Sequence, residues 1–224
     1  MGRGEPDFAA AREKMVERQL RRRGISDERV LEAMGAVPRE LFVAEDLRRR
    51  AYDDGALPIG HSQTISQPWV VAAICQALEL RGAERVLEIG TGSGYSTAVI
   101  ARLAGEVISL ERVAELAEGA RERLAELGVA NAEVIVADGS KGHAERAPYE
   151  AIAVHAATPE APHSLISQLA PKGRLVVPIA TATADLLTVF RRGEAGDESL
   201  TQETIGPCRF VPLIGAEGFS DPAQ

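Results

Sequence analysis

The sequence of 224 residues has few of the residues that mark disulfide-bonded or metal-binding proteins. Its two cysteines, Cys75 and Cys208, are far apart in the chain and cannot form a disulfide framework, a CxxC pair or a zinc knuckle. We expect both to be buried or incidental thiols. We assign no metal, because His61, His143 and His163 have no ligand partners at metal-binding spacing.

Long apolar runs and an excess of basic residues are also missing. No stretch approaches the roughly 20 apolar residues of a membrane span, and the first six residues contain no apolar segment of a signal peptide. Lysine and arginine total 25 against 33 acidic residues, and the net charge of −8 has the wrong sign for binding nucleic acid through its phosphates. We expect a cytoplasmic monomer with no membrane or nucleic-acid partner.

The composition is that of a globular protein with a sizeable core, since 45% of the residues are hydrophobic and 26% are charged. The length fits one domain, or one domain with a small appendage. We expect an N-terminal helical segment with a substrate-side motif packed on the core (residues 1–80), an α/β core (residues 81–215) and a tail (residues 216–224).

The first third of the chain is predicted to be helical. Apolar residues recur at helical spacing over residues 8–23, which predicts an amphipathic surface helix. Ser26 is the expected N-cap of the next helix, whose buried side includes Val30 and Met34. Pro38 begins a further short helical piece.

From Arg85 onward, short apolar runs alternate with helical patterns. The predicted strands are residues 86–89, 107–110, 133–137, 151–154, 175–179, 186–191 and 209–213, and the predicted helices are residues 96–104, 113–127 and 159–169. Residues 192–199 are expected to form a polar hairpin loop. The pattern is typical of a doubly wound, mostly parallel, Rossmann-like α/β sheet with helices on both faces, here with an N-terminal helical extension.

A glycine-rich turn, V-L-E-I-G-T-G-S-G-Y, follows the first of these strands at residues 86–95. At that position of an α/β sheet, glycines let a ligand approach the backbone at the carboxyl ends of the strands. Tyr95 stands where a dinucleotide fingerprint has its third glycine, and no Lys-Ser/Thr pair of a phosphate loop follows. The turn instead resembles the cofactor loop of class I S-adenosylmethionine-dependent methyltransferases.

Three acidic residues lie at the ends of three successive predicted strands: Glu88, Glu111 and Asp138. Each alone could cap a helix, but together on one rim they favour a ligand. Glu111 lies about 20 residues after the glycines, where a carboxylate accepts ribose hydroxyls. An acidic rim suits a sulfonium and disfavours a pyrophosphate, so we expect S-adenosylmethionine rather than NAD. The expected cofactor-binding residues in this region are Glu88, Gly90, Gly92, Gly94, Glu111, Asp138 and Gly139.

The segment A-L-P-I-G-H-S-Q-T-I-S-Q-P at residues 56–68 offers hydroxyls and backbone N–H groups that can hold a carboxylate. It resembles the A-L-P-I-G-x-G-Q-T-I-S-Q-P motif of protein-L-isoaspartate O-methyltransferases. Further matches to that family follow in the right order at residues 36–43, 86–95, 147–152, 156–160, 173–178 and 209–213. The resemblance covers about residues 12–215.

The resemblance implies transfer of a methyl group from S-adenosylmethionine to the α-carboxyl of L-isoaspartyl residues in damaged proteins and peptides, which begins their repair. It gives Ser66 the catalytic role, places Gln63, Thr64 and Ile65 at the cofactor, and leads us to expect Thr64, Ser66 and His155 at the substrate. A carboxylate is already ionised at neutral pH, so no general base is needed. Positioning the acceptor oxygen is the expected source of catalysis.

Four positions depart from the family pattern. Ser62 and Ala180 stand where the family has glycine, and His155 stands where it has threonine. Near Ala184 the family tends to have a glutamine that assists cofactor binding. These differences bear on peptide selectivity and catalytic efficiency.

Other interpretations stay open at this stage. His155 is either a proton acceptor for a neutral nucleophile or, as we favour, a strand-end histidine hydrogen-bonded to backbone. The first interpretation would make the chain a diverged methyltransferase acting on a small molecule or RNA. A non-catalytic module that keeps the cofactor as a structural ligand is a further alternative, against which the intact Ser66, Glu111 and Asp138 argue.

Overall fold

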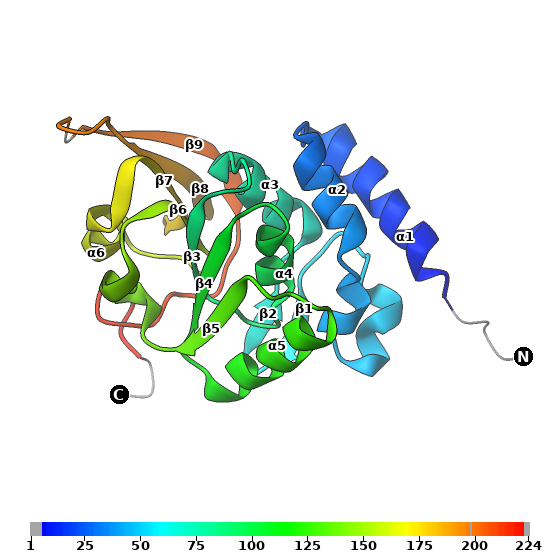
Figure 1. Cartoon of the computed structure of the whole chain (residues 1–224). Helices are drawn as coiled ribbons and strands as arrows, with labels where there is room; N and C mark the ends of the chain where they lie inside the picture. Colours follow the sequence, from blue (N-terminus) through cyan, green and yellow to red (C-terminus); the bar gives the residue numbers. More distant parts are fainter. Residues whose placement is uncertain (1–5, 198, 222–224) are drawn as a thin grey trace, which may run out of the picture.

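The computed structural model describes residues 6–197 and 199–221 (Figure 1). Residues 1–5, on which the signal-peptide argument rests, lie outside the described residues, as do residue 198 of the predicted hairpin loop and residues 222–224 of the expected tail. Within the described part of the chain, no helix combines the length and apolar character needed to cross a membrane.

A seven-stranded sheet forms the centre of the fold, with strand order β5-β4-β3-β6-β7-β8-β9. The strands are β3 (Arg85–Ile89), β4 (Glu106–Glu111), β5 (Ala132–Val136), β6 (Tyr149–Val154), β7 (Leu169–Ala180), β8 (Asp185–Arg192) and β9 (Leu200–Cys208). The pairings from β5 through β7 are parallel, and those of β8 and β9 are antiparallel. The chain proceeds outward from β3 to β5 and then returns to the other side of β3 as β6, so the strand order reverses between β3 and β6.

Helices cover both faces of the sheet, as the alternation of strands and helices predicted. One face packs against α3 (Pro68–Leu78), α4 (Tyr95–Ala101) and α5 (Ala114–Glu126), and α2 (Glu28–Ala36) packs in turn on α3 and α4. The other face is covered by the short α6 (His163–Ser167) and by Leu213 near the C-terminus. Along β3, Val86 belongs to the first apolar cluster and Leu87 to the second, as expected of a strand buried on both sides.

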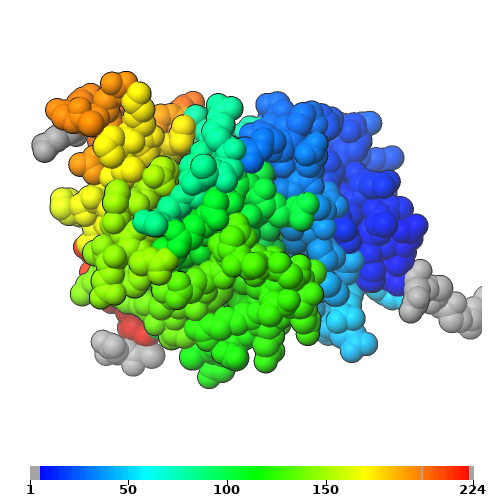
Figure 2. Space-filling view, in the orientation of Figure 1, coloured from blue at the N-terminus to red at the C-terminus, as the bar shows by residue number. Residues whose placement is uncertain are grey.

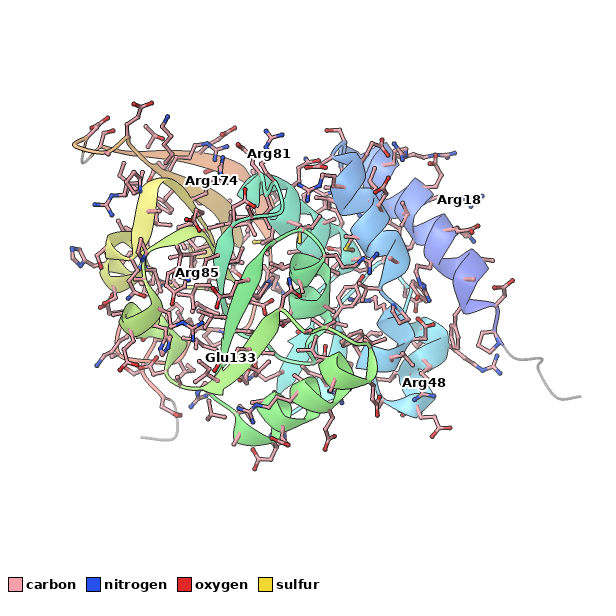
Figure 3. The ribbon with its side chains drawn as sticks, viewed as in Figure 1. Arg18, Arg48, Arg81, Arg85, Glu133 and Arg174 are labelled. Carbon is pink, nitrogen blue, oxygen red and sulfur yellow. The ribbon has the colours of Figure 1, made fainter. Side chains whose placement is uncertain are left out.

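The amino ends of the central strands carry an ion-pair network. Arg85 Nε lies 2.6 Å from Glu106 Oε2, and Arg146 contacts both Glu106 Oε1 at 2.5 Å and Glu133 Oε2 at 3.3 Å. Figure 3 labels Arg85 on β3 and Glu133 on β5. The two ends of the sheet therefore differ in chemistry, because the glycine-rich loop lies at the carboxyl end.

The N-terminal helix was predicted over residues 8–23. It consists of α1 (Phe8–Met15), a π-helical turn (Val16–Leu20) and a 3-10 turn (Arg21–Arg23). This segment, blue in Figure 2, packs beside the rest of the molecule. The short helical piece expected after Pro38 is confirmed as two 3-10 helices, Arg39–Phe42 and Glu45–Arg50.

The predicted cap of α2 was one residue early. Asp27, not Ser26, is the N-cap, and its side chain accepts a hydrogen bond from Arg29 N at 2.9 Å. The backbone N–H groups of Ser26 and Asp27 both donate to Gln76 Oε1, at 2.7 and 3.0 Å. Because Gln76 comes from α3, this tertiary contact could not be seen in the local sequence.

Two elements predicted in the last third of the chain differ from the structure: one is shorter and one is not a strand. The helix predicted at residues 159–169 is reduced to α6, because the residue before Pro162 disfavours the helical conformation. The strand predicted at residues 209–213 is replaced by an isolated bridge between Ala157 and Pro212, and the last strand is β9. The loop predicted at residues 192–199 does join β8 to β9, since Arg192 pairs with Leu200. It projects from the body in Figure 1.

A small hairpin precedes α3. Its strands β1 (Leu57–Gly60) and β2 (Gln63–Ile65) pair antiparallel around the two-residue loop His61-Ser62. Both loop residues have positive φ, 51° and 57°, which is the type I′ geometry that favours Asn-Gly. The hairpin explains why a glycine suits position 62 better than the serine found there. Cys75 on α3 is buried, Cys208 at the end of β9 is partly exposed, and both thiols are free.

Candidate active site

The glycine-rich loop (residues 90–94) turns sharply between β3 and α4. Gly90 has φ 92° and its N–H donates to Leu110 O at 2.8 Å, which ties the loop to β4. Gly92 has φ 54°, and a Cβ there would come within 3.2 Å of Ile59 Cδ1 from the β1–β2 hairpin. Position 92 therefore favours glycine for two reasons: its φ is positive, and the hairpin comes close to its backbone.

A cavity opens above this loop at the carboxyl ends of the parallel strands, beside the point between β3 and β6 where the strand order reverses. Its empty space is about 830 Å³, open solvent at the mouth included. This is the position at which open α/β sheets bind ligands. The predicted site residues that line the cavity are Gln63, Thr64, Ile65, Ser66, Gly90, Gly92, Glu111, Gly139 and His155.

Glu111 ends β4 and belongs to the cavity wall. Its Oε2 accepts a hydrogen bond from Gly92 N at 2.9 Å, and its Oε1 accepts one from Val113 N at 3.0 Å. Each oxygen keeps a further lone pair, because a carboxylate oxygen can accept more than one hydrogen bond. The carboxylate is thus held in place by the loop and remains able to accept ligand hydroxyls.

Glu88 lies behind the cavity rather than on its wall. Its side chain is fully buried, and its Oε2 accepts hydrogen bonds from Thr97 and from Ser109, the latter at 2.6 Å. The expectation that three acids share one rim is corrected here, because Glu88 is the penultimate residue of β3 and faces α4 and β4. Gly94 also lies off the wall, at the N-cap of α4.

Asp138 likewise lies outside the main cavity and ties down the end of the chain. Its Oδ2 accepts a hydrogen bond from Ala216 N at 3.0 Å, and its Oδ1 accepts one from Ser140 N at 2.9 Å. Burial raises the pKa of the carboxyl, but these hydrogen bonds outweigh it, so the pKa lies below its usual value. Asp138 therefore anchors residues that follow the cavity-lining segment, while its neighbour Gly139 lines the cavity.

His155 follows β6 and faces Gly90 across the floor of the cavity. Its Nε2 lies 2.8 Å from Ser96 Oγ and 3.2 Å from Glu88 Oε1, so its ring contacts side chains rather than the backbone we had favoured. Its backbone N–H continues the β3–β6 pairing by donating to Ile89 O at 2.8 Å. Among the described residues, the ring's Nδ1 has no hydrogen-bond partner.

The β1–β2 hairpin delivers the T-I-S run to the opposite wall. Ser66 follows β2 directly and is partly exposed in the cavity. Its hydroxyl has no hydrogen-bond partner within the described part of the chain, whereas its carbonyl accepts one from Arg39 Nη2 at 2.8 Å. The backbone at Ser66 is held while its side chain is available to a ligand.

Several lining residues were missed by the sequence analysis. The C-terminal segment 211–214 forms a wall, and it is fixed by a hydrogen bond from Leu213 N to Ala157 O at 2.7 Å. The match of residues 209–213 to a family motif could have indicated this. Ser96 and Arg112 also line the cavity, and neither carried a signal of its own. The Arg112 guanidinium pairs with Asp221 at 2.9 Å.

The residues present fit S-adenosylmethionine. Glycines at positions 90 and 92 leave the backbone open to a ligand, and the carboxylate of Glu111 is fixed where it can accept hydroxyls. Among the described residues that line the wall, the one lysine or arginine is Arg112, and it is already paired with Asp221. The donor set therefore suits a cationic nucleoside better than a pyrophosphate.

Comparisons with known proteins agree with this geometry. The model of the family described as Protein-L-isoaspartate(D-aspartate) O-methyltransferase (PCMT) matches residues 10–218. Protein-L-isoaspartate O-methyltransferase 1 of Rhodopseudomonas palustris (strain HaA2) is 52% identical over 217 residues, which cover 96% of this chain and 88% of the relative. The enzyme of that name from Methanoculleus marisnigri is 51% identical over 208 residues, which cover 93% of each chain.

Solved structures give the same result. A protein-L-isoaspartate O-methyltransferase aligns with a TM-score of 0.81 at 30% identity, over 92% of this chain and 66% of that chain. A Plasmodium falciparum protein, described as a candidate protein-L-isoaspartate O-methyltransferase in complex with S-adenosyl-L-homocysteine, aligns with a TM-score of 0.76 at 26% identity. That alignment covers 94% of this chain and 99% of the other.

Proposed function

Since this chain belongs to the protein-L-isoaspartate O-methyltransferase family, we propose that its cavity is the site where the methyl group of S-adenosylmethionine passes to the α-carboxyl of an L-isoaspartyl residue. The reaction begins the repair of damaged proteins. One observation carries the proposal: Ser66 and the glycine-rich loop line the same cavity, together with Glu111. Cofactor-side and substrate-side motifs, distant in sequence, are thereby brought together.

Cofactor binding is assigned to the wall formed by the glycine-rich loop. Glu111 accepts the ribose hydroxyls, Gly90 and Gly92 allow close approach, and Gly139 lies at the base. Gln63, Thr64 and Ile65 close the site from the hairpin. Three residues support the site from outside the cavity: Glu88 holds α4, Gly94 shapes the loop, and Asp138 holds the C-terminal segment. S-adenosylmethionine, when bound, would supply an activated methyl group, and its sulfur would keep the electron pair of the broken S–C bond.

The protein's own task is to hold the acceptor. An isoaspartyl α-carboxylate is ionised at neutral pH, so no side chain has to remove a proton. Ser66 Oγ, which lacks a partner within the described residues, donates a hydrogen bond to that carboxylate and offsets the cost of burying it. Holding the carboxylate oxygen near the methyl group can contribute about 7–11 kcal/mol in favourable cases.

We assign Thr64 and His155 to the peptide around the acceptor. His155 lies on the cavity floor with Nε2 directed to Glu88 and Ser96, which leaves Nδ1 to accept a hydrogen bond from a peptide N–H. The net charge of −8 supports a protein acceptor rather than a nucleic acid.

The proposal is tested by methyl transfer from labelled S-adenosylmethionine to a synthetic isoaspartyl peptide, with the same peptide containing normal aspartate as control. We expect label in the isoaspartyl peptide alone, and we expect base to release it, because a methyl ester is base-labile. Equal labelling of both peptides, or base-stable label, would contradict the proposed acceptor.

A further inference from the structure

A buried arginine lies directly behind Ser66. Arg39 is 0% exposed; its Nε donates to Ala51 O at 2.7 Å and its Nη2 donates to Ser66 O at 2.8 Å. Its guanidinium carbon lies 4.8 Å from the ring centroid of Tyr95, which itself lines the cavity. The remaining nitrogen, Nη1, is buried and has no hydrogen-bond partner within residues 6–197 and 199–221.

The charge of Arg39 is not balanced by an acidic side chain. Over the described ranges, no carboxylate lies within ion-pair distance of its guanidinium. Glu40, its neighbour in sequence, is engaged by Arg12 Nη2 at 3.0 Å and by the Tyr52 hydroxyl. A guanidinium stays protonated in proteins, and a buried cation without a counter-charge is costly. The arrangement therefore points to an anion that arrives with a ligand.

We propose that Arg39 is a positioning residue that fixes the peptide unit of Ser66 and supplies the positive potential that selects an ionised acceptor carboxylate. The inference rests on the proposed function, because it takes Ser66 as the group that holds the carboxylate. Arg39 acts through Ser66 and across buried protein, where charges interact more strongly than in water and salt screens them little.

The sign of the effect follows from the charges. Methylation removes the negative charge of the acceptor as the new O–C bond forms. A fixed cation therefore stabilises the bound carboxylate more than the transition state, and it gives nothing to the neutral ester. Arg39 should tighten substrate binding without raising kcat, and it should favour release of the product over the substrate.

The test compares two ligands in the presence of S-adenosylhomocysteine: an isoaspartyl peptide, and the same peptide with an α-carboxamide in place of the α-carboxyl. We expect wild-type protein to bind the acid about 10-fold or more tightly than the amide, by calorimetry. Arg39→Met should weaken binding of the acid about 10-fold and of the amide less than about 3-fold, whereas Arg39→Lys should retain most of the preference. In turnover, Arg39→Met should raise KM while kcat stays within about 3-fold of wild type.

Arg29, which is exposed where Arg39 is buried, provides a control for the loss of an arginine that bonds backbone carbonyls. Its guanidinium also donates to two backbone carbonyls, Leu80 O at 2.5 Å and Leu103 O at 3.4 Å, but it does not line or support the cavity. Arg29→Met should leave the preference for the acid unchanged. A larger loss of preference in Arg29→Met than in Arg39→Met would overturn the inference.

Two results separate this inference from the proposed function. If wild-type protein neither methylates nor binds the isoaspartyl peptide, the proposed function fails. If it methylates that peptide but binds acid and amide equally, or if Arg39→Met weakens both ligands by the same factor, only the role of Arg39 fails. The wild-type comparison needs no variant, so equal binding of acid and amide overturns the inference even if Arg39→Met does not fold, and Arg39→Lys then supplies the second comparison.

Discussion

His155 and Glu88 meet beneath the floor of the cavity, with Nε2 of the histidine 3.2 Å from Oε1 of the glutamate. Within the described residues, that oxygen makes no hydrogen bond, although Glu88 is fully buried, so the histidine ring lies near it at ion-pair distance only. The other oxygen is bonded by Thr97 and Ser109. His155 thus serves the carboxylate behind it as well as the cavity in front of it.

Replacing His155 with alanine should lower the free energy of unfolding by about 1–3 kcal/mol, because it removes the polar ring that lies 3.2 Å from an oxygen of a buried carboxylate. Urea denaturation measures the loss. In the His155→Ala background, Glu88→Gln should lower the free energy of unfolding by less than it does in the wild-type background. The reason is that the substitution then removes a buried carboxylate charge that has lost its neighbouring histidine. Strictly additive effects of the two substitutions would argue against the contact.

Ser66→Ala should reduce kcat/KM for an isoaspartyl peptide by about 10- to 150-fold, since a hydrogen bond to a charged group is worth about 1.5–3 kcal/mol. Affinity for S-adenosylhomocysteine should be nearly unchanged. Steady-state kinetics and calorimetry on the same preparation give both values. Wild-type turnover together with wild-type cofactor affinity would remove Ser66 from the mechanism.

Glu111→Gln should weaken S-adenosylhomocysteine binding by about 10-fold, because one amide group cannot accept from Gly92 N, Val113 N and ribose hydroxyls together. The matched control is Glu106→Gln at the opposite end of β4, where the carboxylate pairs with Arg85 and Arg146. Calorimetry should show wild-type cofactor affinity for the control. Equal losses in both variants would indicate a general effect on the sheet.

Asp138→Asn should loosen the C-terminal segment at neutral pH. The folded-state pKa of Asp138 lies below its usual value, so its contribution is present above about pH 3.9 and is lost as the pH falls through the lower folded-state value. Because the side chain is exposed to solvent, the loss at pH 7 should be about 1 kcal/mol at most. Denaturation measured at pH 7 and below pH 3 should show that the difference in unfolding free energy between wild type and variant shrinks in acid. A difference that does not depend on pH would refute this prediction.

Ser62→Gly should raise the free energy of unfolding by about 1 kcal/mol, because serine at φ 57° is strained and glycine is not. Thermal unfolding measures the gain. Gly60→Ala is the opposite case, since glycine there has φ 90°, and it should destabilise the hairpin. A loss of stability in Ser62→Gly would show that the serine side chain contributes something the backbone geometry does not reveal.

Most of the sheet could be predicted because its strands are buried on both faces and therefore appear as short apolar runs. β9 could not, since its residues are mostly exposed and polar at the edge of the sheet. The length of α6 was overestimated because the residues on both sides of it fit a helical pattern. In the structure Pro162 precedes the helix, and β7 begins at Leu169.

The site residues that belong to a sequence motif could be predicted. Those whose position depends on contacts with distant parts of the chain could not. Gln63–Ile65 and Ser66 line the cavity as expected. Glu88 was placed on the rim because it precedes the glycines, but its position one residue before the end of β3 turns it inward. Arg39 lies within the family match at residues 36–43, but its role could not be predicted, because nothing local distinguishes a buried arginine from an exposed one.

Residues 211–214 close the cavity from a position near the end of the chain. On the ribosome they are synthesised after every other wall of the cavity, and N-terminal parts generally fold first. A nascent chain that has just completed β9 can form most of its sheet yet still lacks one side of its binding site. Competence to bind the methyl donor and acceptor is therefore acquired only once residues 211–214 have been added, so chains terminated before them should fold in large part and remain inactive.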